Sequence, residues 1–217
     1  MKHFCISLQD LKDRRRYCQE HFISRGVDVA FFDAYNGKKL GLKTTIPYMD
    51  DQPKWKPGDG PVYRIGFGQV GCLLSHLNVW KTMRHMPGDE FVVFEDDVEL
   101  VENYTERLAV LLNNLPSDWQ FVFLGCCCLP EEQIKVAPQI VKTPHPPMCT
   151  HAYMVKRSAL DVLIETNSFA WSAVDIQMQK LSLKRLNYYT VTPPLAEQLS
   201  ITGRGNSPEF QSQTVHL

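Results

Sequence analysis

The stretch at positions 91–97, FVVFEDD, constrains the fold of this chain more than any other. Its first four residues are all apolar, which is typical of a strand that is buried on both faces at the centre of a sheet. Such strands occur in α/β proteins, in which helices cover both faces of the sheet. Ligands of these proteins bind beyond the carboxyl ends of the strands, so the three acidic residues lie where a ligand is expected.

The rest of the chain shows strands alternating with helices. Apolar spacing, and the Gly, Pro and Ser residues that bound each segment, predict the elements. The expected strands cover 3–8, 28–34, 91–94, 119–125 and 151–155. The expected helices cover 10–25, 69–86, 102–115 and 158–165. This order predicts an α/β fold with a mostly parallel central sheet flanked by helices.

Two further segments are expected to be loops. Four prolines and two glycines lie within 47–61. The part 53–61, with Trp55 and Tyr63, is interpreted either as a lid over a substrate cleft or as a rigid exposed loop. The second segment is the polar stretch beyond Pro193.

Composition and charge narrow the classes of function. The chain has 217 residues, of which 44% are hydrophobic, enough for one sizeable core. Its formal net charge of −1 argues against nucleic acid as the main partner, because phosphate binding usually requires a basic surface. No apolar run reaches the roughly 18–20 residues of a membrane span, and the first ten residues do not form a secretory signal. We expect a cytoplasmic protein, with peripheral association at the inner face of a membrane left open.

The seven cysteines are interpreted as reduced thiols, in keeping with a cytosolic protein. Their number is odd, and the adjacent cysteines 126–128 have poor geometry for a disulfide framework. His145, Cys149 and His151 are not expected to bind zinc, because no CxxC pair accompanies them. A redox role for 126–128 would need an exposed thiol of low pKa, whereas this run follows a predicted buried strand.

The acidic triplet is a candidate metal site. Side chains alternate along an extended chain, so Glu95 and Asp97 are expected on one side and Asp96 on the other. Two carboxylates on one side suit Mn²⁺ or Mg²⁺, which fill their other positions with phosphate oxygens and water. Alternatively, Asp97, Glu99 and Glu102 only place negative charge at the start of the next helix, where the helix dipole favours it.

Several motifs together resemble glycosyltransferase family 25, which includes bacterial lipopolysaccharide galactosyltransferases and collagen-modifying galactosyltransferases. The specific pair is GCLLSH (71–76) followed by EDD (95–97). The weaker matches are ISLQDLKDRR (6–15), FFDAYNG (31–37), THAYMV (150–155), AVDIQM (173–178) and PPLAEQ (193–198). The chain departs from the family at Gln69, where Glu is frequent, which concerns acceptor contacts and not the metal motif.

The resemblance implies a GT-A-type, Rossmann-like nucleotide-sugar fold in one domain, 1–217. Residues 1–125 would form mainly the donor half and 126–217 mainly the acceptor half. The implied activity is metal-dependent, inverting transfer of a hexose, with galactose from UDP-galactose as the expected donor, to a hydroxyl of a glycan. The acceptor would be of the lipopolysaccharide type or a glycoprotein. Mn²⁺ or Mg²⁺, held by Glu95 and Asp97, would bridge the diphosphate of the UDP-sugar.

The resemblance also assigns residues to the donor. Arg14 is the member of the run 14–16 expected to face the nucleotide; the alternative is that all three arginines are solvated surface. Ser7 and Asp33, at strand ends, are expected to meet the uracil and the ribose. Asp96 is expected to reach the ribose or the donor sugar.

Four further residues have two interpretations each. Ser75 and His76 are donor-site residues by the GCLLSH match, although a lone helical His is more often structural. Arg204, between two glycines, either clamps the diphosphate or belongs to a flexible tail. Asp175 is the candidate catalytic base, since inversion needs a carboxylate on the acceptor side; the alternative is an acid that only favours a helix start.

Two other classes of function compete with an active glycosyltransferase. A catalytically inactive nucleotide-sugar- or glycan-binding module on the same fold would keep the core and lose the metal acids or the base, and here both are present. A metal-dependent phosphohydrolase could use the same acids, but DxDxT and HExxH patterns are absent.

Overall fold

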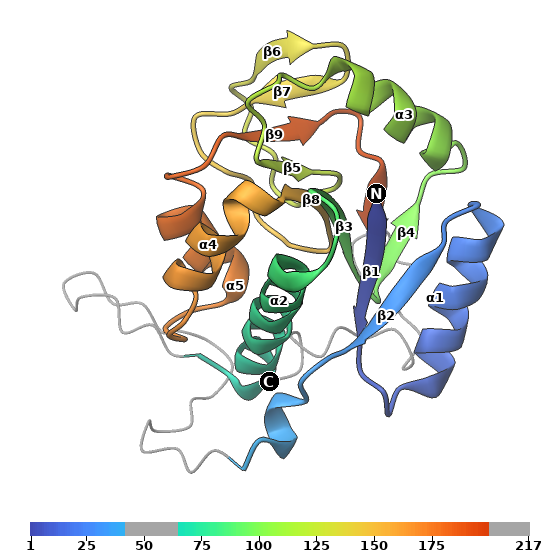
Figure 1. The fold of residues 1–217 in the computed structure, drawn as a ribbon, viewed down its shortest axis with the longest axis vertical. Coiled ribbons are helices and arrows are strands. Elements are labelled where there is room, and N and C mark those ends of the chain that lie inside the picture. The colour runs from blue at the N-terminus through green and yellow to red at the C-terminus, as the bar shows by residue number, and fades with distance from the viewer. Residues whose placement is uncertain (42–64, 200–217) are drawn as a thin grey trace.

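The computed structural model describes residues 1–41 and 65–199. The candidate lid 53–61, with Trp55 and Tyr63, and the candidate clamp Arg204 lie outside the described residues. Within the described part, one eight-stranded sheet forms the centre of the molecule, and two short strands form a second sheet (Figure 1).

The elements have the following bounds. The strands of the large sheet are β1 (Lys2–Ser7), β2 (Val29–Asp33), β3 (Glu90–Glu95), β5 (Phe121–Phe123), β6 (Ile134–Ala137), β7 (Ile140–Lys142), β8 (Ala152–Lys156) and β9 (Tyr188–Val191). The small sheet pairs β4 (Val98–Leu100) with β10 (Ala196–Gln198). The helices are α1 (Lys12–Ser24), α2 (Phe67–His85), α3 (Tyr104–Asn114), α4 (Arg157–Thr166) and α5 (Val174–Gln177), with the short helical turns η1 (Gly37–Lys39) and η2 (Met178–Ser182).

The strand order of the large sheet is β2-β1-β3-β8-β5-β9-β7-β6. The α/β class with a helix-flanked central sheet is confirmed, and the sheet is mixed. β1 runs parallel to β2 and β3, as expected for successive βα units. β8, however, runs antiparallel to both β3 and β5, and the β6–β7 hairpin completes the far edge. A buried antiparallel strand is as apolar as a parallel one, so the sequence pattern does not distinguish them.

Helices cover both faces of the sheet, and β3 shows why its sequence is apolar throughout. Phe91 and Val93 pack in the core cluster formed with α2 and α4, whereas Val92 and Phe94 pack in the cluster formed with α1 and α3. All four side chains are fully buried. In Figure 1, α2, α4 and α5 lie together on one side of the sheet, away from α1 and α3.

The register of the parallel strands brings distant polar residues to one edge of the sheet. Ser7 at the end of β1 pairs with Asp33 at the end of β2, and Ile6 pairs with Glu95 at the end of β3. The carboxyl ends of β1, β2 and β3 therefore meet, and the residues that follow them form the site described below.

The segment beyond Pro193 is not entirely loop, contrary to expectation. Ala196–Gln198 forms β10, which pairs antiparallel with β4 so that Gln198 lies opposite Val98. Three residues are too few for a periodic signal, because such a strand depends on its partner for its hydrogen bonds. This pairing brings the later part of the chain against the acidic motif.

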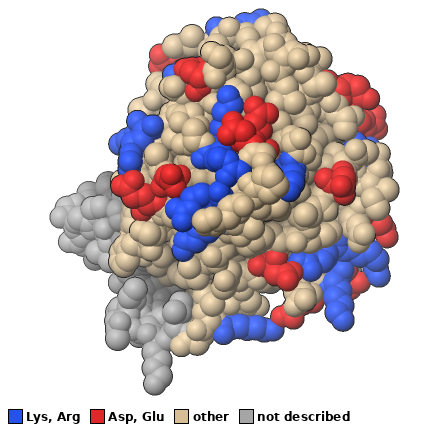
Figure 2. All heavy atoms as spheres, viewed as in Figure 1, with Lys and Arg blue, Asp and Glu red and all other residues tan. Residues whose placement is uncertain are grey.

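Two surface properties bear on possible partners. On the face seen in Figure 2, basic and acidic side chains are intermixed, in keeping with the net charge of −1. Among the described residues, none of the helices combines the length and apolar character required to span a bilayer.

Candidate functional site

A cavity of about 110 Å³ lies at the carboxyl ends of β1 and β3. Besides apolar and glycine residues from 6–11, 34–37 and 68–72, its walls contain seven of the residues predicted for the donor and the metal. These are Ser7, Arg14, Ser75, His76, Glu95, Asp96 and Asp97. Segments that lie far apart in the sequence thus converge on one concave site, which is the usual place for a ligand.

Arg14 supplies a fixed positive charge beside the acidic triplet. Its Nε lies 3.0 Å from Oδ1 of Asp96, and its Nη2 lies 3.9 Å from Oδ2 of Asp97. Nε also donates to the backbone carbonyl of Asp96 over 3.3 Å, and the Cys18 thiol donates to the same carbonyl over 3.0 Å. The side chain of Arg14 is buried. Helix α1 therefore holds the turn that carries Asp96 and Asp97 in place.

The expectation that strand alternation separates Asp96 from Glu95 and Asp97 does not hold. β3 ends at Glu95, and the chain turns at Asp96 and Asp97 before β4 begins. Asp96 and Asp97 consequently share Arg14, whereas Glu95 faces His76. All three carboxylates nevertheless line the same cavity.

The other two arginines of the run 14–16 point elsewhere. Arg15 donates from Nη2 to Oδ1 of Asp33 over 2.7 Å and to the carbonyl of Ser7 over 3.1 Å. Asp33 is exposed and does not line the cavity, but Arg15 ties it to the cavity residue Ser7. Arg16 is 70% exposed in its side chain and pairs with Asp13 at 2.9 Å.

A buried chain of hydrogen bonds orients Glu95. Trp80 donates from Nε1 to the Tyr153 hydroxyl (2.9 Å), which lies 2.9 Å from Nδ1 of His76; Nε2 of His76 lies 3.1 Å from Oε1 of Glu95. Trp80 can only donate, so the Tyr153 oxygen accepts from it, and an ionised Glu95 accepts from Nε2 of His76. Thr150 donates to the same Oε1 over 2.5 Å. Burial would raise the pKa of Glu95, but His76 and Thr150 outweigh it and lower that pKa.

At Asp97, in contrast to Glu95, the effects that raise the pKa are stronger than those that lower it. Burial, together with the nearby charge of Glu95, raises the pKa of Asp97 to about 7, although the hydrogen bond from Gln198 and the charge of Arg14 oppose this. Gln198 donates from Nε2 to Oδ2 of Asp97 over 2.8 Å. Burial likewise raises the pKa of Asp96, with Arg14 again opposing. The motif therefore combines a well-stabilised carboxylate, Glu95, with one that takes up a proton near neutral pH.

Ser75 holds one wall of the cavity together. Its hydroxyl accepts from the backbone N–H of Tyr35 over 2.8 Å and donates to the carbonyl of Gly71 over 2.7 Å. A Cβ atom at Gly71 would lie 2.7 Å from the backbone nitrogen of Gly37, so only glycine allows this approach. This contact explains why the FFDAYNG and GCLLSH motifs occur together: they pack against each other.

Gln69, which stands where the family often has Glu, makes a hydrogen bond that Glu could also make. Its Oε1 accepts from the backbone N–H of Gly66 over 2.9 Å and so caps the first turn of α2. Glutamate at this position would offer the same acceptor oxygen.

Asp175 lies outside the cavity lining, at the start of α5. Its Oδ2 accepts from the backbone N–H of Cys149 over 3.2 Å, and its Oδ1 accepts from that of Ile176 over 2.8 Å. Burial, with the charges of Glu95 and Asp175, raises the pKa of the cavity residue Cys72. Asp175 is therefore close enough to act electrostatically on the cavity wall.

The interpretation of all cysteines as reduced thiols is wrong. Cys127 and Cys149 form a disulfide with a Cα–Cα distance of 5.7 Å, although they are separated by 22 residues. Adjacent cysteines argue against bonds between neighbours, but they do not exclude a bond from one of them to a distant partner. The bond removes one ground for the expected cytoplasmic location, namely reduced cysteines, because disulfides persist mainly in oxidising compartments.

Two side chains of the site were missed in the sequence, namely Thr150, which donates to Glu95, and Gln198, which donates to Asp97. Both belong to segments that resemble the family, THAYMV (150–155) and PPLAEQ (193–198). Those segments were the available signal, since neither residue has a local pattern of its own.

Comparison with known proteins decides the family. The model of glycosyltransferase family 25 (lipopolysaccharide biosynthesis protein) matches residues 1–178. The chain belongs to glycosyltransferase family 25. The α/β fold and the acidic motif that follows its central strand agree with this membership.

Curated relatives show the breadth of this family. A glycosyltransferase 25 family member of Aedes aegypti is 29% identical over 137 residues, which cover 61% of this chain and 22% of the relative. Human procollagen galactosyltransferase 2 is 26% identical over 176 residues, covering 76% of this chain and 28% of that protein. The inactive glycosyltransferase 25 family member 3 of Mus musculus is 29% identical over 145 residues, covering 61% and 23%. The chain thus spans about a quarter of the length of these relatives.

Proposed function

We propose that this chain is a metal-dependent, inverting glycosyltransferase that transfers a hexose from a UDP-sugar to a hydroxyl of a glycan. The observation that carries the proposal is the convergence of Ser7, Arg14, His76 and the acidic motif 95–97 on one cavity. Cavities at the carboxyl ends of parallel strands are where nucleotide ligands bind in α/β proteins. Membership of family 25 supplies the reaction class.

The acidic motif fits a divalent cation. Oδ1 of Asp97 is buried and lacks a hydrogen-bond partner among the described residues. The hydrogen bonds that Glu95 receives from His76 and Thr150 both go to Oε1, which leaves Oε2 for another partner. Carboxylate oxygens are the ligands that Mn²⁺ and Mg²⁺ prefer. Glu95 and Asp97 would hold the ion, which would stabilise the charge of the departing diphosphate.

Arg14 and Asp96 would position the donor. Arg14 is buried against Asp96 and Asp97. Its positive guanidinium therefore offsets the repulsion between the neighbouring carboxylates when no ligand is bound. Ser7 lies at the end of β1 beside Asp96 and offers a hydroxyl to the nucleotide. Asp33 would contribute from the rim, through its ion pair with Arg15.

Asp175 is the proposed base that takes the proton from the acceptor hydroxyl. Inversion requires this group on the face of the sugar opposite the leaving diphosphate. Asp175 approaches the cavity from α5, whereas Arg14 and Asp97 lie toward α1. The hydrogen bonds that Asp175 accepts from the backbone N–H groups of Cys149 and Ile176 would also serve an acid that only fixes the start of α5.

The substrates are proposed from the named relatives. Galactose is the expected hexose, because human procollagen galactosyltransferase 2 is among the similar proteins. The acceptor would be a glycan or a glycosylated protein, of the lipopolysaccharide or glycoprotein type. The cavity at the carboxyl ends of β1 and β3 would bind the donor.

A non-catalytic, nucleotide-sugar-binding role is the second candidate, because the similar mouse protein is named inactive. One experiment distinguishes the two functions. The protein is incubated with Mn²⁺ and a panel of nucleotide sugars. The release of UDP, of free hexose and of inorganic phosphate is measured, together with the affinity of the protein for UDP. Slow release of UDP and hexose, absent with Asp97→Asn, is expected. UDP binding without release would support the inactive module, and release of inorganic phosphate would indicate a phosphohydrolase. A lack of both binding and release would overturn the proposal.

A further inference from the structure

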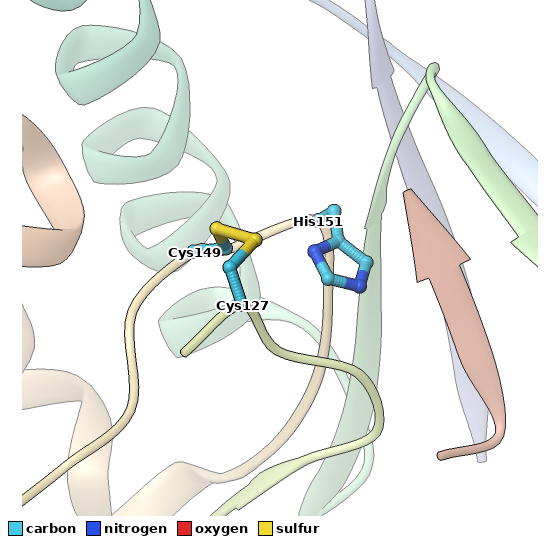
Figure 3. A group of neighbouring side chains, drawn as sticks. All are labelled: Cys127, Cys149 and His151. Carbon is cyan, nitrogen blue, oxygen red and sulfur yellow. A yellow bond between two sulfur atoms is a disulfide. The ribbon is translucent and has the colours of Figure 1, made fainter. Parts of the chain in front are cut away.

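A second group of metal-ligating side chains lies beside the candidate site. The sulfur atoms of Cys127 and Cys149 and a ligating nitrogen of His151 all lie within 4.8 Å of one another (Figure 3). Cys127 follows β5, whereas Cys149 and His151 lie in the segment that enters β8. The expectation that zinc is absent considered His145 together with Cys149 and His151. It did not include Cys127, because the chain brings that residue in from 22 positions away.

The imidazole of His151 is buried and lies next to the carbonyl group of Ala196. It is 1% exposed, and neither ring nitrogen has a hydrogen-bond partner of normal geometry among the described residues. Buried polar atoms without partners are rare and often mark the place of a water or an ion. One ring nitrogen of His151 is turned toward the disulfide in Figure 3. The ring thus offers a lone pair to the space that the two sulfur atoms occupy.

The other side of the ring is suited to fix the tautomer. A Cβ atom at Gly125 would lie 2.4 Å from Nε2 of His151 and 2.1 Å from the carbonyl oxygen of Ala196. These two atoms therefore lie close together, and only glycine leaves room for both. A metal-ligating histidine commonly directs its second ring N–H at a carbonyl oxygen, which leaves the first nitrogen free to bind the ion.

We propose that Cys127, Cys149 and His151 form a site for a thiolate-preferring ion such as Zn²⁺ when the disulfide is reduced. A dithiol reductant would supply two electrons and two protons, converting the disulfide into two thiols and becoming a disulfide itself. The ion would then displace both thiol protons, and His151 would donate a lone pair. Water would complete a tetrahedral set, as in zinc sites with three protein ligands.

The remaining cysteines are poorer candidates. Cys72, His76 and Glu95 also lie close together, but both nitrogens of His76 are engaged, by Tyr153 and by Glu95. That group belongs to the candidate donor site. Cys128 is exposed and lies outside both groups.

The proposed ion differs in chemistry from the cation of the donor site. Thiolate and imidazole ligands select Zn²⁺ or Co²⁺, whereas carboxylate oxygens suit Mn²⁺ and Mg²⁺. The inference does not depend on the proposed function, since it rests on the disulfide and His151 alone.

Co²⁺ provides a direct test, because it gives a strong thiolate-to-cobalt absorption band only when sulfur is a ligand. The protein is reduced under anaerobic conditions in excess Mg²⁺ and titrated with Co²⁺, then with Zn²⁺. We expect one Co²⁺ per chain, displaced by Zn²⁺, and no band from the oxidised protein. Cys149→Ser should abolish the band, and His151→Gln should weaken binding by about tenfold or more. Cys128→Ser serves as the matched control and should behave as the unmodified protein.

A second measurement avoids any effect of substitution on folding. The reduced, unmodified protein is treated with iodoacetamide with and without Zn²⁺, and the modified cysteines are identified by mass spectrometry. We expect Zn²⁺ to protect Cys127 and Cys149 and to leave Cys128 reactive. The proposal is overturned if the folded, reduced protein gives no thiolate band, if the band persists in Cys149→Ser, or if Zn²⁺ does not protect Cys127.

Discussion

The buried Arg14 forms an ion pair with the largely buried Asp96, with Nε of the arginine 3.0 Å from Oδ1 of the aspartate, although the two residues lie 82 positions apart in the sequence. The pair joins the first turn of α1 to the turn after β3. It places a cation at the end of a helix where the helix dipole disfavours one, and the acidic motif compensates for this. The positive charge that the acidic triplet requires is thus partly built into the protein itself.

Replacing Arg14 should destabilise the fold through the carboxylates it leaves behind. Arg14→Met is expected to lower the free energy of unfolding by about 3 kcal/mol at pH 8, because breaking a buried pair leaves an uncompensated charge. Arg14→Met combined with Asp96→Asn should recover part of this loss. Urea denaturation followed by circular dichroism measures both. Arg16→Met is the control and should change stability by less than about 0.5 kcal/mol, since its pair with Asp13 is exposed. Equal effects at positions 14 and 16 would contradict the assignment.

The raised pKa of Asp97 predicts how stability depends on pH. The folded protein, with a pKa of about 7 at Asp97, holds this proton more tightly than the unfolded chain, where the value is 3.8. Asp97 therefore favours the folded state below about pH 4, and this contribution is lost as the pH rises to about 7. Without metal, Asp97→Asn should gain stability relative to the unmodified protein across this window, by on the order of 1–3 kcal/mol.

Denaturation in a chelating buffer at several pH values tests this expectation. Mn²⁺ added at pH 8 should stabilise the unmodified protein clearly more than Asp97→Asn, because the asparagine amide is neutral and offers the ion only one oxygen. A stability difference that stays constant from pH 4 to pH 8 would show that Asp97 does not titrate as described.

Asp175→Asn separates catalysis from local structure. If Asp175 is the base, Asp175→Asn should reduce turnover by about 10²-fold or more. The affinity for UDP should stay unchanged. Both carboxylate oxygens accept backbone N–H groups, so the variant should also lose some thermal stability, because an amide offers one acceptor oxygen only. Turnover is measured with saturating donor and acceptor, with Asp161→Asn as an exposed control. Turnover within a few-fold of the unmodified protein would remove Asp175 from the mechanism.

The disulfide should contribute measurably to stability. Closing a loop between cysteines 22 positions apart is expected to stabilise the fold by about 3 kcal/mol, by restricting the unfolded chain. Reduction in a chelating buffer, or Cys127→Ala combined with Cys149→Ala, should remove this amount in a urea denaturation experiment. Cys128→Ala should have little effect. Unchanged stability after complete reduction would argue against the bond.

Secondary-structure elements could be predicted from the sequence where their own residues determine them, and not where they depend on distant parts of the chain. The segments from β1 to β3 were predicted because each has a long apolar pattern that its own residues determine. β4, β6, β7, β9 and β10 were missed because three or four residues are too few to show a periodic pattern.

The same division applies to the site. Glu95, Asp96 and Asp97 could be found because they are contiguous and follow a buried strand. Thr150 and Gln198 could not, since each acts through one hydrogen bond to a residue that is 55 or 101 positions away. Cys127 and Cys149 could not be paired for the same reason.

Because β4 pairs with β10, the surroundings of the acidic motif include residues close to position 198. The family match ends at residue 178, yet Gln198 donates its hydrogen bond to Asp97 from β10. A fragment cut at the family boundary would keep all three acidic residues and lose the strand whose Gln198 donates to Asp97. A shortened version of this protein that preserves the contact between Gln198 and Asp97 therefore has to include residues up to at least 198, which is beyond the region that the family model matches.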